Sequence, residues 1–194
     1  IDMNDEQPNL YEPVRATMQD SIKQIIAQQG PKRSQIQILD ALLKLRQVCC
    51  HPSLLNLDSL PKGKSAVKSK AMHSAKLDYL IETVTDMVAE GRKVLIFSQF
   101  TSMLALIEQR LHSENIGFSK LTGKTKKRSE AIEAFQSGQV PVFLISLKAG
   151  GVGLNLTTAD TVIHYDPWWN PAAEDQASDR AWRIGQDKPV FVYK

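Results

Sequence analysis

The spacing of apolar residues predicts helices in the first part of the chain. Between residues 34 and 50 such residues recur at helical intervals, at Ile36, Leu39, Leu42, Leu43 and Val48. Residues 6–29 are expected to form a preceding helix, and Gly30-Pro31 separates the two. His51-Pro52 ends the second helix, because the residue before a proline is pushed out of the helical region. We therefore predict a helical extension over residues 1–52.

The pattern changes after residue 74, where short apolar runs alternate with segments of helical periodicity. Two fully apolar runs span residues 94–97 and 140–145, a third candidate strand spans 161–165, and shorter candidate strands span 117–121 and 190–193. Strands of this kind, separated by helices, are typical of a parallel sheet covered on both faces. We predict an α/β domain over residues 75–194. Ligands of such sheets bind beyond the carboxyl ends of the strands, so function is expected in the loops after Phe97, Ile145 and Tyr165.

A basic linker joins the two predicted parts. Residues 53–74 are rich in proline, glycine and serine, and they hold one acid, Asp58, against four lysines, Lys62, Lys64, Lys68 and Lys70. The whole chain has a formal net charge of only +3, so its positive charge is concentrated there. Two interpretations stay open: a loop kept in water by its lysines, or a segment that faces phosphates.

Composition narrows the class of protein. With 42% hydrophobic and 23% charged residues, the chain of 194 residues suits one globular domain with an appended piece. The two cysteines, Cys49 and Cys50, are adjacent and cannot join distant segments, which favours a reducing compartment. No apolar run approaches the roughly 18 residues of a membrane span. The chain begins without an initiator methionine and stops in an apolar run, so we expect a fragment of a longer protein.

Two motifs follow the predicted strands that end at Ile145 and Tyr165. Residues 146–155 hold three glycines within four positions, which lets backbone N–H groups approach a phosphate, although such loops are as often simple tight turns. Residues 165–171 place Trp168 and Trp169 between two prolines. An exposed indole there suits stacking on bases, while one of the two, Trp168, is expected to pack against the sheet.

A pair of arginines forms the third motif. Arg180 and Arg183 lie three residues apart and so share a helix face, with Gln176 one turn earlier. Two permanently charged, planar guanidinium groups suit a triphosphate, because they neutralise charge on the transferring oxygens. An isolated pair of this kind more often forms surface salt bridges, and only the neighbouring motifs favour the phosphate interpretation.

Together these segments resemble the second motor lobe of SWI/SNF-type, ATP-driven translocases on double-stranded DNA, a family of superfamily 2 helicase-like ATPases. The resemblance covers nearly the whole chain, in the family's expected order, and rests on residues 45–52, 93–100, 121–135, 146–155, 166–171 and 176–186. One departure is Trp182, where many members have histidine, and it leaves both arginines in place.

The resemblance implies a RecA-like lobe that completes a split active site. Arg180 and Arg183 become candidate arginine fingers for ATP bound on the other lobe, with Gln176 as their support. The candidate nucleotide-side loop residues are Gly151, Gly153 and Asn155. The candidate contacts to double-stranded DNA are Ser98, Gln99, Ser146, Lys148 and Trp169.

The motifs that bind ATP and Mg²⁺ are not convincingly present in this sequence. Residues 117–125 imitate a phosphate loop but hold five residues between the glycines, where four are required. Asp166 imitates a metal-binding acid, yet Pro167 and Trp168 follow where a second acid is expected. Cys49-Cys50-His51 lacks the spacing of a zinc site. We therefore expect no metal site here, ATP and Mg²⁺ bound mainly by an absent first lobe, and no turnover by this chain alone.

Two other functions stay open at this stage. A non-catalytic DNA-binding or scaffold module with the same fold predicts that substitutions of Arg180 and Arg183 are tolerated. A free-standing nucleotide-binding enzyme, with residues 150–153 as its phosphate loop, predicts ATP binding by the chain alone. In every case the protein is expected in the nucleoid-associated cytoplasm of a bacterium or the nucleus of a eukaryote, and no membrane partner is expected.

Overall fold

The computed structural model describes residues 6–30, 34–54, 74–149, 154–166, 168, 170–181 and 186–194. The chain divides into two compact units, Ile1–Tyr79 and Leu80–Lys194. The boundaries predicted at residues 52/53 and 74/75 stay predictions.

The first unit contains the two predicted helices. Helix α1 spans Glu6–Gln29, helix α2 spans Gln35–Cys50, and a short 3-10 helix, η1, follows at Pro52–Leu54. Their common core consists of Met18, Ala41 and Val48, against which Tyr11, Ile22 and Leu45 pack. His51 ends α2 in an extended conformation (φ −164°, ψ 131°), as expected for a residue before proline.

The apolar positions that predicted α2 are mostly exposed. Of that set only Val48 is buried, whereas Ile36 is 78% and Leu39 is 61% exposed. The helix is therefore present as predicted, but its described contacts use the neighbouring positions Ala41 and Leu45.

The second unit is built on a five-stranded sheet in which every neighbouring pair is parallel. The strands lie in the order β2-β3-β1-β4-β5. Their bounds are Val94–Ser98 for β1, Phe118–Leu121 for β2, Val142–Ser146 for β3, Thr161–His164 for β4 and Phe191–Tyr193 for β5. The three central strands, β1, β3 and β4, are buried at every position. The prediction of a parallel α/β sheet is confirmed.

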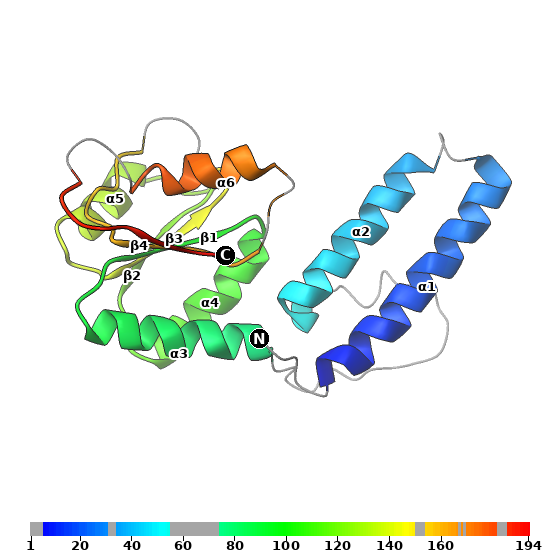
Figure 1. Ribbon diagram of the computed structural model, residues 1–194, viewed down its shortest axis with the longest axis horizontal. Coiled ribbons are helices and arrows are strands. Elements are labelled where there is room, and N and C mark those ends of the chain that lie inside the picture. Colours follow the sequence, from blue (N-terminus) through cyan, green and yellow to red (C-terminus); the bar gives the residue numbers. More distant parts are fainter. Residues whose placement is uncertain are drawn as a thin grey trace. The chain divides into compact units, whose positions relative to one another are not determined.

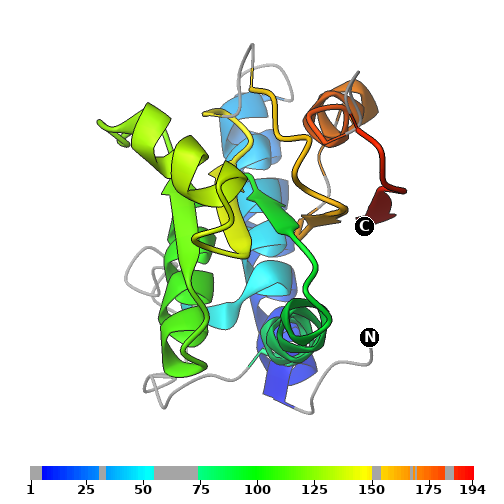
Figure 2. The ribbon, with the colours of Figure 1, turned by 90° about the vertical axis from the view of Figure 1, so that its left-hand side faces the viewer.

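Helices cover both faces of this sheet (Figures 1 and 2). Helix α3 (Ala75–Ala89) and helix α4 (Thr101–Ser113) lie on one face, and α5 (Arg128–Gln136) and α6 (Pro171–Ser178) lie on the other. Leu95 and Phe97 of β1 belong to the same core cluster as Phe135 of α5 and Ala177 of α6. On the α4 side the fully buried residues are Met103, Leu104, Ile107 and Leu111.

The parallel arrangement brings the carboxyl ends of the strands to one edge. Ser98 of β1 pairs in register with Ser146 of β3, and Phe97 pairs with His164 of β4. The loops that follow these strands therefore start side by side, which is where ligands of open parallel sheets bind. No described helix is long and apolar enough to cross a membrane.

Candidate functional site

A basic pocket opens beyond the carboxyl ends of β1, β2 and β3. Its volume is about 670 Å³, and its lining residues are Gln99, Thr101, Ser102, Lys120, Thr122, Gly123, Lys124, Thr125, Ser146 and Lys148. Every charged side chain in this lining is a lysine, and five other lining residues carry hydroxyl groups. Ammonium and hydroxyl donors together suit the oxygens of a phosphate group.

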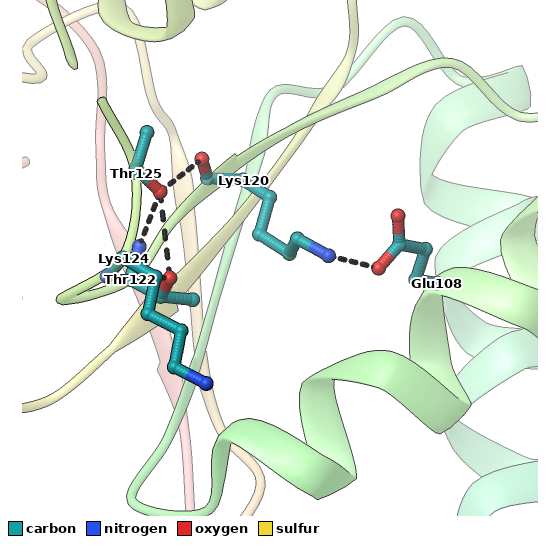
Figure 3. Close-up of polar contacts among 5 residues, drawn as sticks. All are labelled: Glu108, Lys120, Thr122, Lys124 and Thr125. Atoms are coloured by element: carbon teal, nitrogen blue, oxygen red, sulfur yellow. Dashed lines mark hydrogen bonds and ion pairs between the residues drawn. The ribbon is translucent and has the colours of Figure 1, made fainter. Parts of the chain in front are cut away.

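The turn after β2 is held by the hydroxyl of Thr125 (Figure 3). This oxygen accepts a hydrogen bond from Thr122 N at 2.9 Å and donates to the carbonyl of Lys120 at 3.3 Å. Thr125 N in turn donates to Thr122 O at 3.1 Å. The turn is therefore fixed by its own side chains, and it carries Lys124 at the pocket.

The lysines of the pocket differ in how their charges are engaged. Lys120 forms an ion pair with Glu108 of α4, as Figure 3 shows, so part of its charge is already neutralised. Lys124 and Lys148 are exposed. We therefore regard Lys124 and Lys148 as the two cations most available to a bound anion.

A buried carboxylate lies behind the pocket at the end of β4. Asp166 is 1% exposed, and it accepts a hydrogen bond from the hydroxyl of Ser98 through Oδ2 and from Gln99 N through Oδ1 at 3.0 Å. Ser98 is itself 0% exposed. The Ser98 hydroxyl thus braces the edge of the sheet, while Gln99 reaches the pocket lining.

A second buried carboxylate, Glu174, holds the segment that leads into α6. It is 7% exposed, and Oε1 accepts a hydrogen bond from Trp168 N at 2.8 Å. Its Oε2 forms an ion pair with Lys194 at 3.1 Å. Burial raises the pKa of this carboxyl, but the hydrogen bond from Trp168 and the contact with Lys194 outweigh burial and leave the pKa below its usual value. Glu174 is therefore ionised near neutral pH.

His164 lies beside this acid, on β4. Its Nε2 is 3.0 Å from the Ser178 hydroxyl, which itself donates to the carbonyl of Glu174. Because the Ser178 proton is engaged in that way, the tautomer of His164 with its hydrogen on Nε2 fits this contact. Burial lowers the pKa of His164, which keeps the ring neutral near pH 7.

Of the residues predicted to face the nucleotide, some belong to the described residues and others do not. Arg180 lies just beyond α6 and is 5% exposed, and its carbonyl accepts a hydrogen bond from Leu156 N at 3.0 Å. Gln176 and Asn155 are exposed, and the Asn155 carbonyl accepts from Gln136 Nε2 at 2.6 Å. The other candidates lie outside the described residues: Gly151, Gly153, Arg183 and Trp169. The proposed roles of all these residues stay predictions.

The four described candidates for DNA contact come together. Gln99, Ser146 and Lys148 line the pocket, and Ser98 is buried next to them. Sequence analysis did not identify the other seven lining residues, namely Thr101, Ser102, Lys120, Thr122, Gly123, Lys124 and Thr125. A signal for the turn was available in the short predicted strand that ends at Leu121. Ligands of parallel sheets bind beyond the carboxyl ends of the strands, and residues 122–125 directly follow this end.

Comparison with known proteins identifies relatives of this chain. A family model described as "Helicase conserved C-terminal domain" matches residues 75–185. The protein CHROMATIN REMODELING 24 of Arabidopsis thaliana is 39% identical over 80% of this chain and 17% of its own length. The chain spans about a fifth of the length of the curated relatives it matches.

Solved structures of similar sequence have the same fold. The SWI2/SNF2 ATPase C-terminal domain of Sulfolobus solfataricus is 34% identical, with a TM-score of 0.70, and the match covers 97% of this chain and 73% of that one. The SWI2/SNF2 ATPase core of the same organism, in complex with double-stranded DNA, is 34% identical with a TM-score of 0.75. That match covers 100% of this chain and 38% of the other. The predicted RecA-like fold is confirmed.

Proposed function

Because this chain belongs to the helicase conserved C-terminal domain family, in its SWI2/SNF2-type branch, we propose that it is the second motor lobe of an ATP-driven translocase on double-stranded DNA. The observation that carries the proposal is the basic pocket, which gathers lysine, hydroxyl and amide groups beyond the carboxyl ends of three parallel strands. In this proposal the pocket binds the DNA backbone.

Contacts with the phosphates of the DNA backbone would explain why the pocket holds ammonium and hydroxyl groups. Phosphates are bound by lysine, by serine and threonine hydroxyls and by helix N-termini, and such contacts position a protein without reading sequence. The pocket offers all three, since Thr101 is the first residue of α4. Of the predicted contacts, Gln99 and Lys148 would bind directly, whereas Ser146 is only 2% exposed and its hydroxyl accepts a hydrogen bond from Ala149 N. Ser98, whose hydroxyl is buried against Asp166, would act by holding Gln99 in place.

The nucleotide would be bound mainly by a first RecA-like lobe of the same polypeptide. The described residues contain no group of three histidine, cysteine, aspartate or glutamate side chains suited to a metal ion. Asp166, the acid at the end of β4, is engaged by Ser98 and Gln99. In this proposal Mg²⁺ binds with the phosphates of ATP on the first lobe.

Arg180 and Arg183 would complete the nucleotide site from this lobe. ATP supplies the phosphoryl group whose negative charge must be neutralised during transfer, and an arginine finger contributes roughly 10³ to 10⁵ in rate. The hydrogen bond from Leu156 N to the Arg180 carbonyl joins the backbone at Arg180 to the segment that follows the glycine loop. Gln176 would support the arginines, and Gly151, Gly153 and Asn155 would shape the loop.

The experiment that tests the proposal measures ATP turnover by the intact protein with and without linear double-stranded DNA. We expect DNA to raise turnover, and two DNAs of unrelated sequence to raise it equally. This chain alone should neither hydrolyse ATP nor bind it tightly. ATP turnover that is the same with and without DNA, or ATP turnover by this chain alone, would contradict the proposal. The same proposal places the protein with its DNA, in the nucleoid-associated cytoplasm of a bacterium or in a eukaryotic nucleus.

A further inference from the structure

Two buried carboxylates connect the pocket to the helix that precedes the arginines. Asp166 and Glu174 are 1% and 7% exposed, and they lie at the two ends of the segment that joins β4 to α6. Residues 167 and 169 of that segment lie outside the described residues, and Asp166, Trp168 and Glu174 make the contacts on either side of them.

The first contact joins the segment to the pocket. Gln99 N donates to Asp166 Oδ1 at 3.0 Å, and Gln99 itself lines the pocket. Ser98, directly before Gln99, donates its hydroxyl hydrogen to Oδ2 of the same carboxylate. A ligand that shifts Gln99 therefore acts directly on Asp166, 67 residues later in the chain.

The second contact joins the segment to α6. Trp168 N donates to Oε1 of Glu174, which stands in the first turn of the helix. The start of α6 is also fixed by Asn170, whose Oδ1 accepts from Ala172 N at 3.1 Å. The helix ends at Ser178, and Arg180 follows two residues later.

Hydrogen bonds to buried carboxylates are strong, and leaving one unmade is costly, so the groups they join move together. One bond ties Gln99 to Asp166 at the start of the segment, and a second ties Trp168 to Glu174 of α6. We infer that Asp166 and Glu174 are positioning residues that couple occupancy of the pocket by DNA to the placement of α6 and Arg180, and so make ATP turnover depend on DNA.

This inference rests on the proposed function, and the two are tested by separate measurements. If the unaltered intact protein shows no stimulation of ATP turnover by double-stranded DNA, the proposed function fails. If stimulation is present, the variants below decide whether these carboxylates transmit it.

The decisive variant is Glu174→Ala in the intact protein. It removes the acceptor of Trp168 N while leaving every pocket residue in place. We expect the ratio of DNA-stimulated to unstimulated ATP turnover to fall by about 2- to 30-fold, the range found for residues that transmit coupling. The dissociation constant for DNA, measured by fluorescence anisotropy, should stay within about twofold of wild type, because the pocket lining is unchanged.

Two matched variants separate coupling from general damage. Asp175→Ala removes the neighbouring, exposed acid, which also contacts Lys194 at 3.7 Å, and it should keep the wild-type ratio. Glu174→Gln keeps an oxygen that accepts from Trp168 N and should restore most of the ratio. Glu174→Asp retains the charge, but its carboxylate is retracted by one methylene group. It should lower the ratio of stimulated to unstimulated turnover as Glu174→Ala does, and it replaces the alanine variant if that variant does not fold.

The inference is overturned if Glu174→Ala and Glu174→Asp both keep the wild-type ratio. It is also overturned if Asp175→Ala lowers the ratio as much as Glu174→Ala does, because the Trp168 contact would then be irrelevant. A merely structural role would lower thermal stability and leave the ratio unchanged, so the unfolding temperature of each variant is measured in parallel.

Discussion

Two regions along the same edge of the sheet use charge in opposite ways. Beyond β1, β2 and β3 the charges of Lys124 and Lys148 are exposed around a pocket. Beyond β4 the charges of two acids, Asp166 and Glu174, are buried, and both carboxylates accept hydrogen bonds from the backbone. Exposed charges are available to a ligand that comes and goes, whereas buried charges fix the geometry of the chain. The comparison assigns binding to the first region and positioning to the second.

The largest expected effect concerns the arginines that follow the buried region. We expect Arg183→Ala in the intact protein to lower ATP turnover by about 10³-fold or more, because the finger acts only as charge develops on the phosphoryl group. ATP binding, measured with a fluorescent analogue, should remain mostly intact. Arg183→Lys should recover little, since an ammonium group lacks the planar fork. Retained turnover in Arg183→Ala would remove the arginine from the mechanism.

The next effect tests whether the buried region is structural support. Asp166→Ala leaves the buried Ser98 hydroxyl and Gln99 N without this acceptor. We expect the free energy of unfolding, measured by urea denaturation of the chain, to fall by about 2–4 kcal/mol. Asp166→Asn retains an acceptor for Gln99 N, so its free energy of unfolding should fall by less.

Asp187→Ala, at an exposed acid, serves as the control and should change stability by no more than about 0.5 kcal/mol. If Asp166→Ala were as stable as this control, the buried carboxylate would not hold the edge together.

A smaller effect should appear in the pH dependence of stability. The pKa of His164 is lowered by burial in the folded chain and is about 6.5 in the unfolded chain. The unfolded chain therefore binds the proton more readily, so the contribution of His164 is fully present above about pH 6.5 and declines as pH falls below it. Each unit of lowering corresponds to about 1.4 kcal/mol.

The measurement is urea denaturation of wild type and His164→Gln between pH 7.5 and pH 5. We expect the wild type to lose stability over this range more steeply than the variant. The titration of Glu174 does not interfere, because its pKa lies below the usual carboxyl value and its effect begins at lower pH. Parallel curves for the two proteins would show that His164 is not the group responsible.

The sequence predicted the regular part of the fold because the signal is local. The runs at residues 94–97, 140–145 and 161–165 are rich in apolar residues, and the structure forms the buried central strands β1, β3 and β4 within them. The binding of ligands beyond strand ends pointed to the loops after Phe97 and Ile145, and the resemblance to SWI/SNF-type translocases pointed to Gln99, Ser146 and Lys148 within them. The strand that ends at Leu121 has partly exposed positions and gives a weaker signal, so the lysine and threonine residues of the next turn were missed.

The buried region was not predictable in the same way. Ser98 and Asp166 are 68 residues apart, and a single aspartate at a strand end gives no sign of which hydroxyl it will meet. Sequence pattern also failed to say which face of α2 is covered, because Ile36 and Leu39 are exposed while Ala41 is buried. Periodicity identifies a helix, but tertiary contacts decide which of its residues are buried.

The most direct test of binding by the exposed region is the salt dependence of DNA affinity. We compare wild type, Lys124→Ala/Lys148→Ala and the charge-matched control Lys127→Ala/Lys188→Ala in the intact protein, whose two lysines are exposed and lie outside the pocket lining. If the pocket binds phosphates, the slope of log affinity against log salt concentration should shrink by about 2 in the pocket variant and remain near wild type in the control. Equal slopes for the two double variants would show that DNA does not bind in this pocket.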